Sequence, residues 1–238
     1  MDIQGKRAIV LGGTSGIGLA ATRQLEAAGA SVVACSRSES NLATAKEATG
    51  DAVSFRAIDV LDRDALAALF EGEAGFDILV NAATGGERAS GPFLQMDLDG
   101  FQGSFRKLWG YTNSVRLGTE HMAEDAAIVL VSGYPAKKSN PGSSAIATVG
   151  NAVEGFVRAV APELAPRRIN VVSPGIIDTP MFAATGDARA NFLSGATRNM
   201  LIKRAGTADE VASAIIFVIQ NDYMTGASID VDGGATLP

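Results

Sequence analysis

The sequence has few of the residues that build disulfide frameworks, membrane spans and nucleic-acid surfaces. Its single cysteine, Cys35, has no partner within the chain, and its place in an apolar segment indicates a packing role. The strongest apolar run, 214–219, is much shorter than a membrane-spanning helix, so no membrane contact is expected. The formal net charge of −6 argues against nucleic acid as a partner, because phosphate neutralisation needs a concentrated basic surface.

The chain also lacks an apolar signal segment ahead of its first strand, and we therefore expect a cytoplasmic location. Hydrophobic residues make up 47% of the sequence and charged residues 19%, as is typical of globular proteins. At 238 residues, one domain over 1–238 is expected. No metal site is predicted.

Strand-like and helix-like segments alternate along the whole sequence. Strands are expected at 7–11, 31–36, 53–58, 78–81, 127–132, 169–172 and 227–231. Helices are expected at 16–28, 39–48, 63–71, 101–122, 144–164 and 208–219. The strands are short and almost entirely apolar, which indicates cover on both faces. The pattern predicts an α/β fold, a single doubly wound, Rossmann-type domain with a parallel sheet of about seven strands.

A glycine-rich turn links the first strand to the first helix. Gly12, Gly16 and Gly18 lack a Cβ, so backbone N–H groups can approach a pyrophosphate and the helix can pack closely on the strand. The helix N-terminus adds unpaired N–H donors and a partial positive charge. A second apolar strand completes a βαβ unit, the setting that this dinucleotide-binding pattern requires. The contacts predicted here are Gly12, Thr14, Ser15, Gly16, Ile17 and Gly18.

The second strand ends where such a fold meets the adenosine ribose of its cofactor. An acidic residue at this point would favour a free 2′-hydroxyl, but the chain has Ser36, Arg37 and Ser38. The guanidinium of Arg37 can form paired hydrogen bonds with a 2′-phosphate. The sequence therefore favours NADP(H) over NAD(H). The alternative is that Arg37 is an ordinary solvated side chain.

Polar or small residues follow the later strands at the same sheet edge. Asp59 is expected to accept a hydrogen bond from the adenine amine, and the proline turn that starts at Pro174 brings Thr179 to the cofactor. The segments 83–91 and 174–206 are candidate walls or lids of a substrate pocket, and the latter is the predicted substrate loop. The further predicted cofactor contacts are Asp59, Val60, Asn81, Ala82, Ala83, Pro174, Gly175, Ile177 and Thr179.

These motifs resemble those of the short-chain dehydrogenase/reductase (SDR) family, and the likeness covers essentially the whole chain. The matching segments are 11–18, 81–84, 174–179, 204–212, 225–226 and 231–234. The resemblance implies an oxidoreductase that transfers hydride between NADP(H) and a small organic substrate. It also implies a homodimer or homotetramer assembled through the two long helices, 101–122 and 144–164.

The chain departs from the family's catalytic pattern. That pattern is a Tyr-x-x-x-Lys pair on the second long helix, a serine thirteen residues before the tyrosine, and an asparagine on the preceding helix. Aligned from the segment that starts at Asn151, the tyrosine position holds Ile146 and the lysine position Gly150. The serine position holds Gly133 and the asparagine position Lys107.

Three other side chains are candidates for proton transfer: Tyr134, Tyr111 and Lys107. Lys107 and Tyr111 share one helical face at a spacing of four, and a face turned toward the nicotinamide would make them a rearranged amine and phenol pair. The alternative is a solvated lysine and a tyrosine in a subunit contact. Tyr134 begins a loop beside the expected pocket, but Lys138 does not pair with it because a proline-containing loop does not align such side chains. Ser132 is expected to point away from the position of Gly133, its neighbour in the strand.

Two functions fit these residues best. The first is an NADP(H)-dependent oxidoreductase with an unusual proton donor, best suited to a polarised double bond whose reduction needs little help from a protein acid. The second is a catalytically inactive NADP(H)-binding protein that serves as a sensor, scaffold or partner subunit. A third possibility is that cofactor binding has been lost and the pocket holds another ligand. The first is preferred by a narrow margin.

Overall fold

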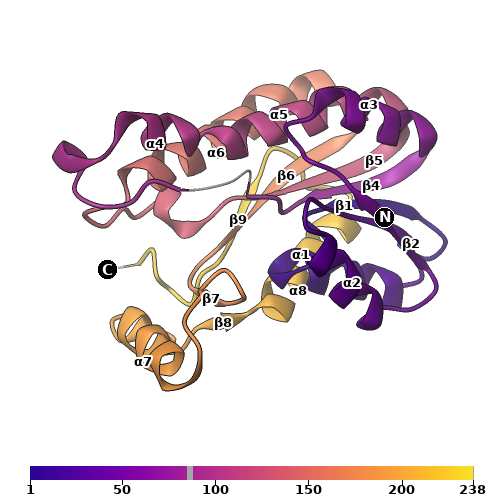
Figure 1. The fold of residues 1–238 in the computed structure, drawn as a ribbon. Helices are drawn as coiled ribbons and strands as arrows, with labels where there is room; N and C mark the ends of the chain where they lie inside the picture. Colours follow the sequence, from indigo (N-terminus) through magenta and orange to yellow (C-terminus); the bar gives the residue numbers. More distant parts are fainter. Residues whose placement is uncertain (85–87, 238) are drawn as a thin grey trace.

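Seven parallel strands form the central sheet of the computed structural model, which describes residues 1–84 and 88–237 (Figure 1). The strand order is β3-β2-β1-β4-β5-β6-β9, and every neighbouring pair is parallel. The expected doubly wound sheet is confirmed. Its strands are β1 (Arg7–Leu11), β2 (Ser31–Ser36), β3 (Val53–Ala57), β4 (Phe76–Asn81), β5 (Met122–Val131), β6 (Arg168–Pro174) and β9 (Ser228–Val231).

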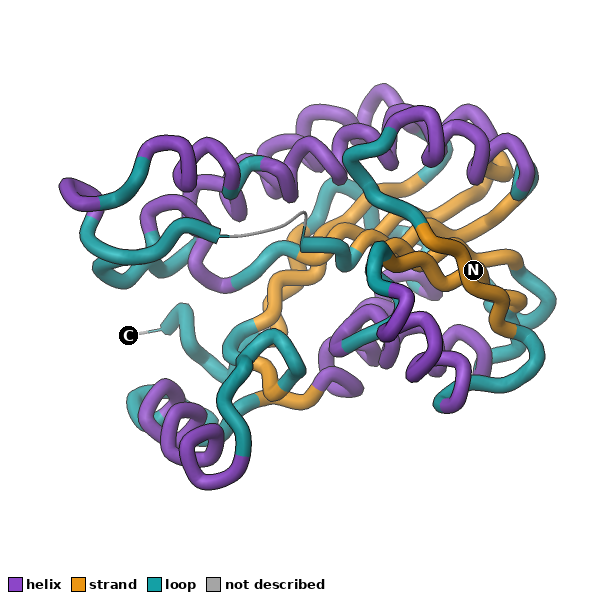
Figure 2. Tube along the Cα trace, viewed as in Figure 1, coloured by secondary structure: helices purple, strands orange, loops and turns teal. Residues whose placement is uncertain are grey.

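Helices cover both faces of this sheet (Figures 1 and 2). One face carries α1 (Gly16–Ala27), α2 (Glu39–Glu47) and α8 (Ala208–Gln220). The other carries α3 (Arg63–Gly72), α5 (Arg106–Gly118) and α6 (Ser144–Leu164). Three short 3-10 turns are η1 (Phe93–Gln95), η2 (Thr119–His121) and η3 (Tyr134–Ala136). Across the described residues, no helix is both long enough and apolar enough to cross a bilayer.

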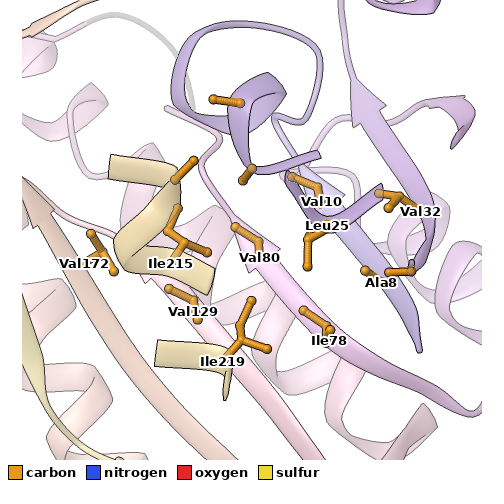
Figure 3. Close-up of a cluster of buried hydrophobic side chains, with 14 of the residues drawn as sticks. Ala8, Val10, Leu25, Val32, Ile78, Val80, Val129, Val172, Ile215 and Ile219 are labelled. Atoms are coloured by element: carbon orange, nitrogen blue, oxygen red, sulfur yellow. The ribbon is translucent and has the colours of Figure 1, made fainter. Parts of the chain in front are cut away.

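The core consists of two apolar layers, one on each side of the sheet. Alternate residues of a strand face opposite ways, so Val10 packs with Leu25 and Ile215 on the α1 and α8 side (Figure 3). Its neighbour Leu11 packs with the α3, α5 and α6 layer. Cys35 is buried in that second layer, as expected of a packing residue, and burial raises the pKa of its thiol to about 12.

The expected helix at 101–122 is divided in the structure. A short helix, α4 (Leu98–Gly103), ends before α5 begins at Arg106, and β5 already begins at Met122. Gly100 and Gly103 lower helix propensity at the break. The Ser104 hydroxyl accepts a hydrogen bond from the Ala89 N–H (2.9 Å), which ties the 88–91 segment to the junction of the two helices.

The long segment after β6 contains secondary structure of its own. Two short strands, β7 (Ile177–Asp178) and β8 (Gly206–Thr207), pair in parallel and are separated in sequence by α7 (Gly186–Thr197). Figure 1 shows α7 set apart from the central sheet. The Arg189 side chain bonds to the Asp178 carboxylate and to the carbonyl oxygens of Thr179, Phe182 and Ala184. One arginine thus fixes α7 to the turn that precedes it.

Candidate active site

A cavity of about 1090 Å³ opens at the carboxyl ends of the strands. It lies where the strand order reverses between β1 and β4, the point at which open α/β sheets bind ligands. Gly12, after β1, and Ala82, after β4, both line it. All but two of the predicted cofactor contacts line this cavity, and the two exceptions are Asp59 and Asn81.

The glycine turn forms a cradle that exists only because its glycines lack a Cβ. Gly12 has a φ of +78°, and a Cβ there would lie 2.8 Å from the Ala83 nitrogen. A Cβ at Gly18 would lie 2.0 Å from the Gly12 carbonyl oxygen, so α1 could not pack against the turn. No side-chain hydrogen bond from Ser15 caps α1, which leaves the first N–H groups of the helix for a ligand. The geometry fits the pyrophosphate of a dinucleotide.

The two predicted contacts outside the cavity lining instead hold its walls in place. The Asp59 carboxylate accepts from the Leu61 N–H at 2.9 Å and lies 3.5 Å from the Arg37 guanidinium. Asn81 is buried, where its amide nitrogen donates to the Ser114 hydroxyl and its oxygen accepts from the Ala83 N–H. Arg37 itself lines the cavity, with its side chain about half exposed.

Lys107 lies at the inner end of the cavity. Its ammonium donates to the Ser132 carbonyl oxygen at 3.2 Å and lies 5.5 Å from the centre of the Tyr111 ring. Burial, together with the positive charge of Arg88, lowers the pKa of Lys107 to about 7. The helical face that carries Lys107 and Tyr111 therefore faces inward, and the solvated alternative does not hold.

Tyr111 has a different environment from Lys107, although the two share a helical face. It is 1% exposed and lies behind the cavity lining, and its hydroxyl donates to the Val131 carbonyl oxygen at 2.7 Å. Burial raises the pKa of its phenol above the usual value. Because its proton is held by a backbone oxygen, we do not retain Tyr111 as a proton donor.

Residues just beyond β5 also line the cavity. Tyr134 lines the cavity, whereas the Lys138 ammonium donates to the Leu237 carbonyl oxygen, so the two do not form a Tyr-x-x-x-Lys pair. The expectation that Ser132 points away was wrong. Its hydroxyl donates to the Gly150 carbonyl oxygen of α6 at 3.3 Å, and Ser132 lines the cavity beside Gly133. Ser132 follows the last residue of β5, so strand alternation no longer sets its direction.

Arg88, Phe182 and Phe192 are among the lining residues that were not predicted individually. Arg88 lies in the glycine-rich segment 83–91, of which residues 85–87 fall outside the described part of the chain. Phe182 and Phe192 lie in the predicted substrate loop, with ring centroids 4.9 Å apart. The sequence feature that could have revealed Arg88 is a positively charged residue soon after the fourth strand. Neither phenylalanine is part of a pattern that would distinguish it from a core residue.

Comparison with known proteins assigns the family. Residues 12–236 match the family model described as enoyl-(acyl carrier protein) reductase. The chain is 32% identical over 240 residues to carbonyl reductase family member 4 of Danio rerio, which covers 97% of this chain and 98% of that protein. It is also 32% identical to the 3-oxoacyl-[acyl-carrier-protein] reductase FabG of Thermotoga maritima, with both chains covered in full. The chain belongs to the short-chain dehydrogenase/reductase family.

Solved structures of SDR proteins agree with this assignment. A small-chain dehydrogenase in complex with NADPH superposes with a TM-score of 0.84 at 30% identity, covering 99% of this chain and 100% of that one. A short-chain type dehydrogenase/reductase from Mycobacterium ulcerans gives a TM-score of 0.89 at 26% identity, covering 100% of this chain and 92% of that one. The protein is thus an SDR-type oxidoreductase.

The region of α6 aligned with the SDR tyrosine and lysine is closely packed in this protein. Ile146 lines the main cavity one turn before Gly150. A Cβ at Gly150 would lie 2.9 Å from the Cβ of Ala136 in η3. The Asn151 amide donates to the Ala136 carbonyl oxygen at 2.6 Å and fixes η3 against α6. Ala136 therefore fills the space into which a side chain at position 150 would extend.

Proposed function

We propose that this SDR protein is an NADP(H)-dependent oxidoreductase for a small organic substrate, with Lys107 in place of a tyrosine as the proton donor. The observation that carries the proposal is the position of the Lys107 amine at the inner end of the dinucleotide-sized cavity. Burial and Arg88 bring its pKa to about 7, and a general acid works best when its pKa lies near the working pH.

The residues of the cavity fit an NADP(H) cofactor. The cradle at Gly12 and Gly18 suits the pyrophosphate. Arg37 lines the cavity with its side chain about half exposed, so its guanidinium can bind a 2′-phosphate beside its long, 3.5 Å ion pair with Asp59. A related SDR protein has been solved in complex with NADPH. When bound, NADPH supplies the hydride for the reaction.

The proton of the reaction comes from the chain itself. The Ser132 carbonyl oxygen orients the Lys107 ammonium, and a substrate whose oxygen or α-carbon lies beside this amine takes its proton. Lys107 becomes neutral in that step and regains a proton from water. Tyr134 lines the same cavity and is the second donor to test. A polarised carbonyl or carbon–carbon double bond is the substrate chemistry that this arrangement serves.

One observation favours a second candidate function, an NADP(H)-binding protein without catalysis. Ile146 cannot exchange a proton, and the packing of Ala136 against Gly150 leaves no room for a lysine on α6. These features remove the tyrosine and lysine that the family uses for proton transfer, while the phosphate cradle at Gly12 and Gly18 is present. Turnover that depends on Lys107 separates the two candidates.

The test begins with NADPH and NADH titrations of the wild-type protein, Arg37→Ala and the control Arg23→Ala, an exposed arginine of α1. We expect Arg37→Ala to weaken NADPH binding roughly tenfold or more, while NADH binding and the control stay unchanged. Reduction of a panel of carbonyl compounds and conjugated acids then follows. Lys107→Met is expected to lose about a hundredfold to ten-thousandfold in rate with NADPH binding retained. NADPH binding without turnover would favour the second candidate, and no nucleotide binding would contradict both.

A further inference from the structure

A second, smaller cavity adjoins the inner end of the first. Its volume is about 50 Å³, and on the same measure a space of about 10–15 Å³ already holds a water molecule. Lys107, Arg88 and Ser132 line both cavities, so the smaller one continues the larger. Gly150 also lines the smaller cavity. The cavity is large enough for a group of a few non-hydrogen atoms.

Four polar side chains are among the described residues that line this small cavity. Arg88 and Lys107 are cations, and the hydroxyls of Ser104 and Ser132 complete the polar part of the lining. Its remaining side chains are apolar and come from Pro135, Ile146 and Val149. No carboxylate is among the described residues that line it.

Among the described residues, no carboxylate pairs with either of the two cations of this cavity. Lys107 bonds only to a neutral carbonyl oxygen, and no ion pair or hydrogen bond is found for the Arg88 guanidinium among residues 1–84 and 88–237. The charge of Arg88 disfavours the protonated form of Lys107, so the two groups repel each other. Two like charges in a partly desolvated space are costly, and a bound anion removes that cost.

The backbone beside Arg88 is held by a hydrogen bond to α5's N-terminal side. Its neighbour Ala89 donates its N–H to the Ser104 hydroxyl at 2.9 Å, and that hydroxyl donates to the Gly100 carbonyl oxygen at 3.0 Å. The chain on the carboxyl side of Arg88 is therefore attached to the α4–α5 junction, one turn from Lys107. The Arg88 guanidinium carries paired N–H donors, which match the two oxygens of a carboxylate.

We propose that Arg88 binds a carboxylate of the substrate in the small cavity, and that the reducible double bond of this acid lies beside Lys107. The inference rests on the proposed function and narrows its substrate to small organic acids, such as conjugated enoates and 2-oxo acids. The planar carboxylate fits a space of this size, and the larger cavity, with Phe182 and Phe192, receives the apolar remainder of the molecule.

The test measures binding of matched acids and amides to the full chain by calorimetry, with and without NADPH. The probes are cinnamate and phenylpyruvate, each compared with its primary amide. The variants are Arg88→Gln and the control Arg106→Gln, which removes an equal charge from an exposed residue next to Lys107. Arg88→Lys keeps the charge and provides a second variant in case Arg88→Gln does not fold.

We expect the wild-type protein and Arg106→Gln to bind each acid roughly tenfold or more tightly than its amide. Arg88→Gln loses that preference, and Arg88→Lys keeps part of it. Amides that bind as well as acids, or a preference that survives in Arg88→Gln, would overturn the proposal. The acid-to-amide ratio decides this question even where NADPH fails to bind, and such a failure would count against the proposed function alone.

Discussion

The Lys107 ammonium lies 3.2 Å from the Ser132 carbonyl oxygen, a contact that links α5 to the residue following β5. Burial is the main cause of the low pKa of this lysine, about 7, and the charge of Arg88 adds to it. Arg88 and the Tyr111 ring are the charged and titratable groups that face it in the described structure. Because the donor must be protonated, we expect the rate of reduction to fall as pH rises through about 7. The measurement is kcat/KM against pH.

The same pKa is measurable without turnover, by NMR of ¹³C-methylated lysines. Arg88→Gln removes the neighbouring positive charge, so the pKa of Lys107 is expected to rise, while Arg106→Gln leaves it unchanged. A Lys107 resonance that titrates in the ordinary lysine range in the wild-type protein would contradict the assignment of this residue as the acid.

Lys107 should also make stability depend on pH. Its folded pKa of about 7 lies below the ordinary value of 10.5, so the unfolded chain binds more protons between these two pH values. Burying the charge therefore destabilises the fold fully below pH 7, and the penalty is relieved as pH rises toward 10.5. We expect Lys107→Met to raise the melting temperature clearly at pH 6 and much less at pH 10. An equal increase at both pH values would show that charge is not the cause.

Close packing between α6 and η3 predicts how an added methyl group at Gly150 changes stability. Gly150→Ala places a Cβ 2.9 Å from the Cβ of Ala136, and overpacking of this kind typically costs about 1–3 kcal/mol. Ala136→Gly in the same chain should restore much of the loss. The control is Gly155→Ala in the same helix, where a Cβ meets no atom within 4 Å and a gain of up to about 1 kcal/mol is expected. Denaturant unfolding measures all three variants, and similar effects at the two glycines would argue against the contact.

Oligomeric assembly through the two long helices remains a prediction. Trp109 of α5 is 52% exposed and continues a row of aromatic rings that includes Phe101 and Phe105. A homodimer or homotetramer would cover this row. Light scattering should give a multiple of the 24.4 kDa chain mass, and Trp109→Glu should lower it. A monomer in the wild-type protein would contradict the prediction.

The sequence was informative where one backbone geometry requires one residue type. Gly12 and Gly18 revealed the phosphate cradle because a Cβ at either position collides with the backbone. The apolar alternation of Val10 and Leu11 likewise predicted a strand covered on both faces. Arg88 escaped prediction because its role depends on a distant contact, the Ala89–Ser104 hydrogen bond, which no local pattern records.

Lys107 and Tyr111 show the limit of spacing arguments. Their spacing of four correctly placed both on one face of α5, yet only the structure separates a cavity-lining amine from a phenol bonded to Val131. Ser132 shows the same limit, because strand alternation stops mattering at the end of the strand. Periodicity gives the direction of a side chain only within a regular element, and active sites lie at the ends of such elements.

Arg189 provides the last test, because its side chain connects α7 to the Asp178 carboxylate and to three carbonyl oxygens of the 179–184 turn. Arg189→Ala leaves those oxygens without this donor, so α7 should open more often and carry Phe192 away from Phe182. We expect faster hydrogen exchange over 178–197 and weaker substrate binding, with the central sheet equally protected. Arg198→Ala, at the exposed end of α7, is the matched control and should change neither quantity. Unchanged exchange in Arg189→Ala would mean that the apolar contacts of α7, rather than this arginine, hold the substrate loop over the cavity.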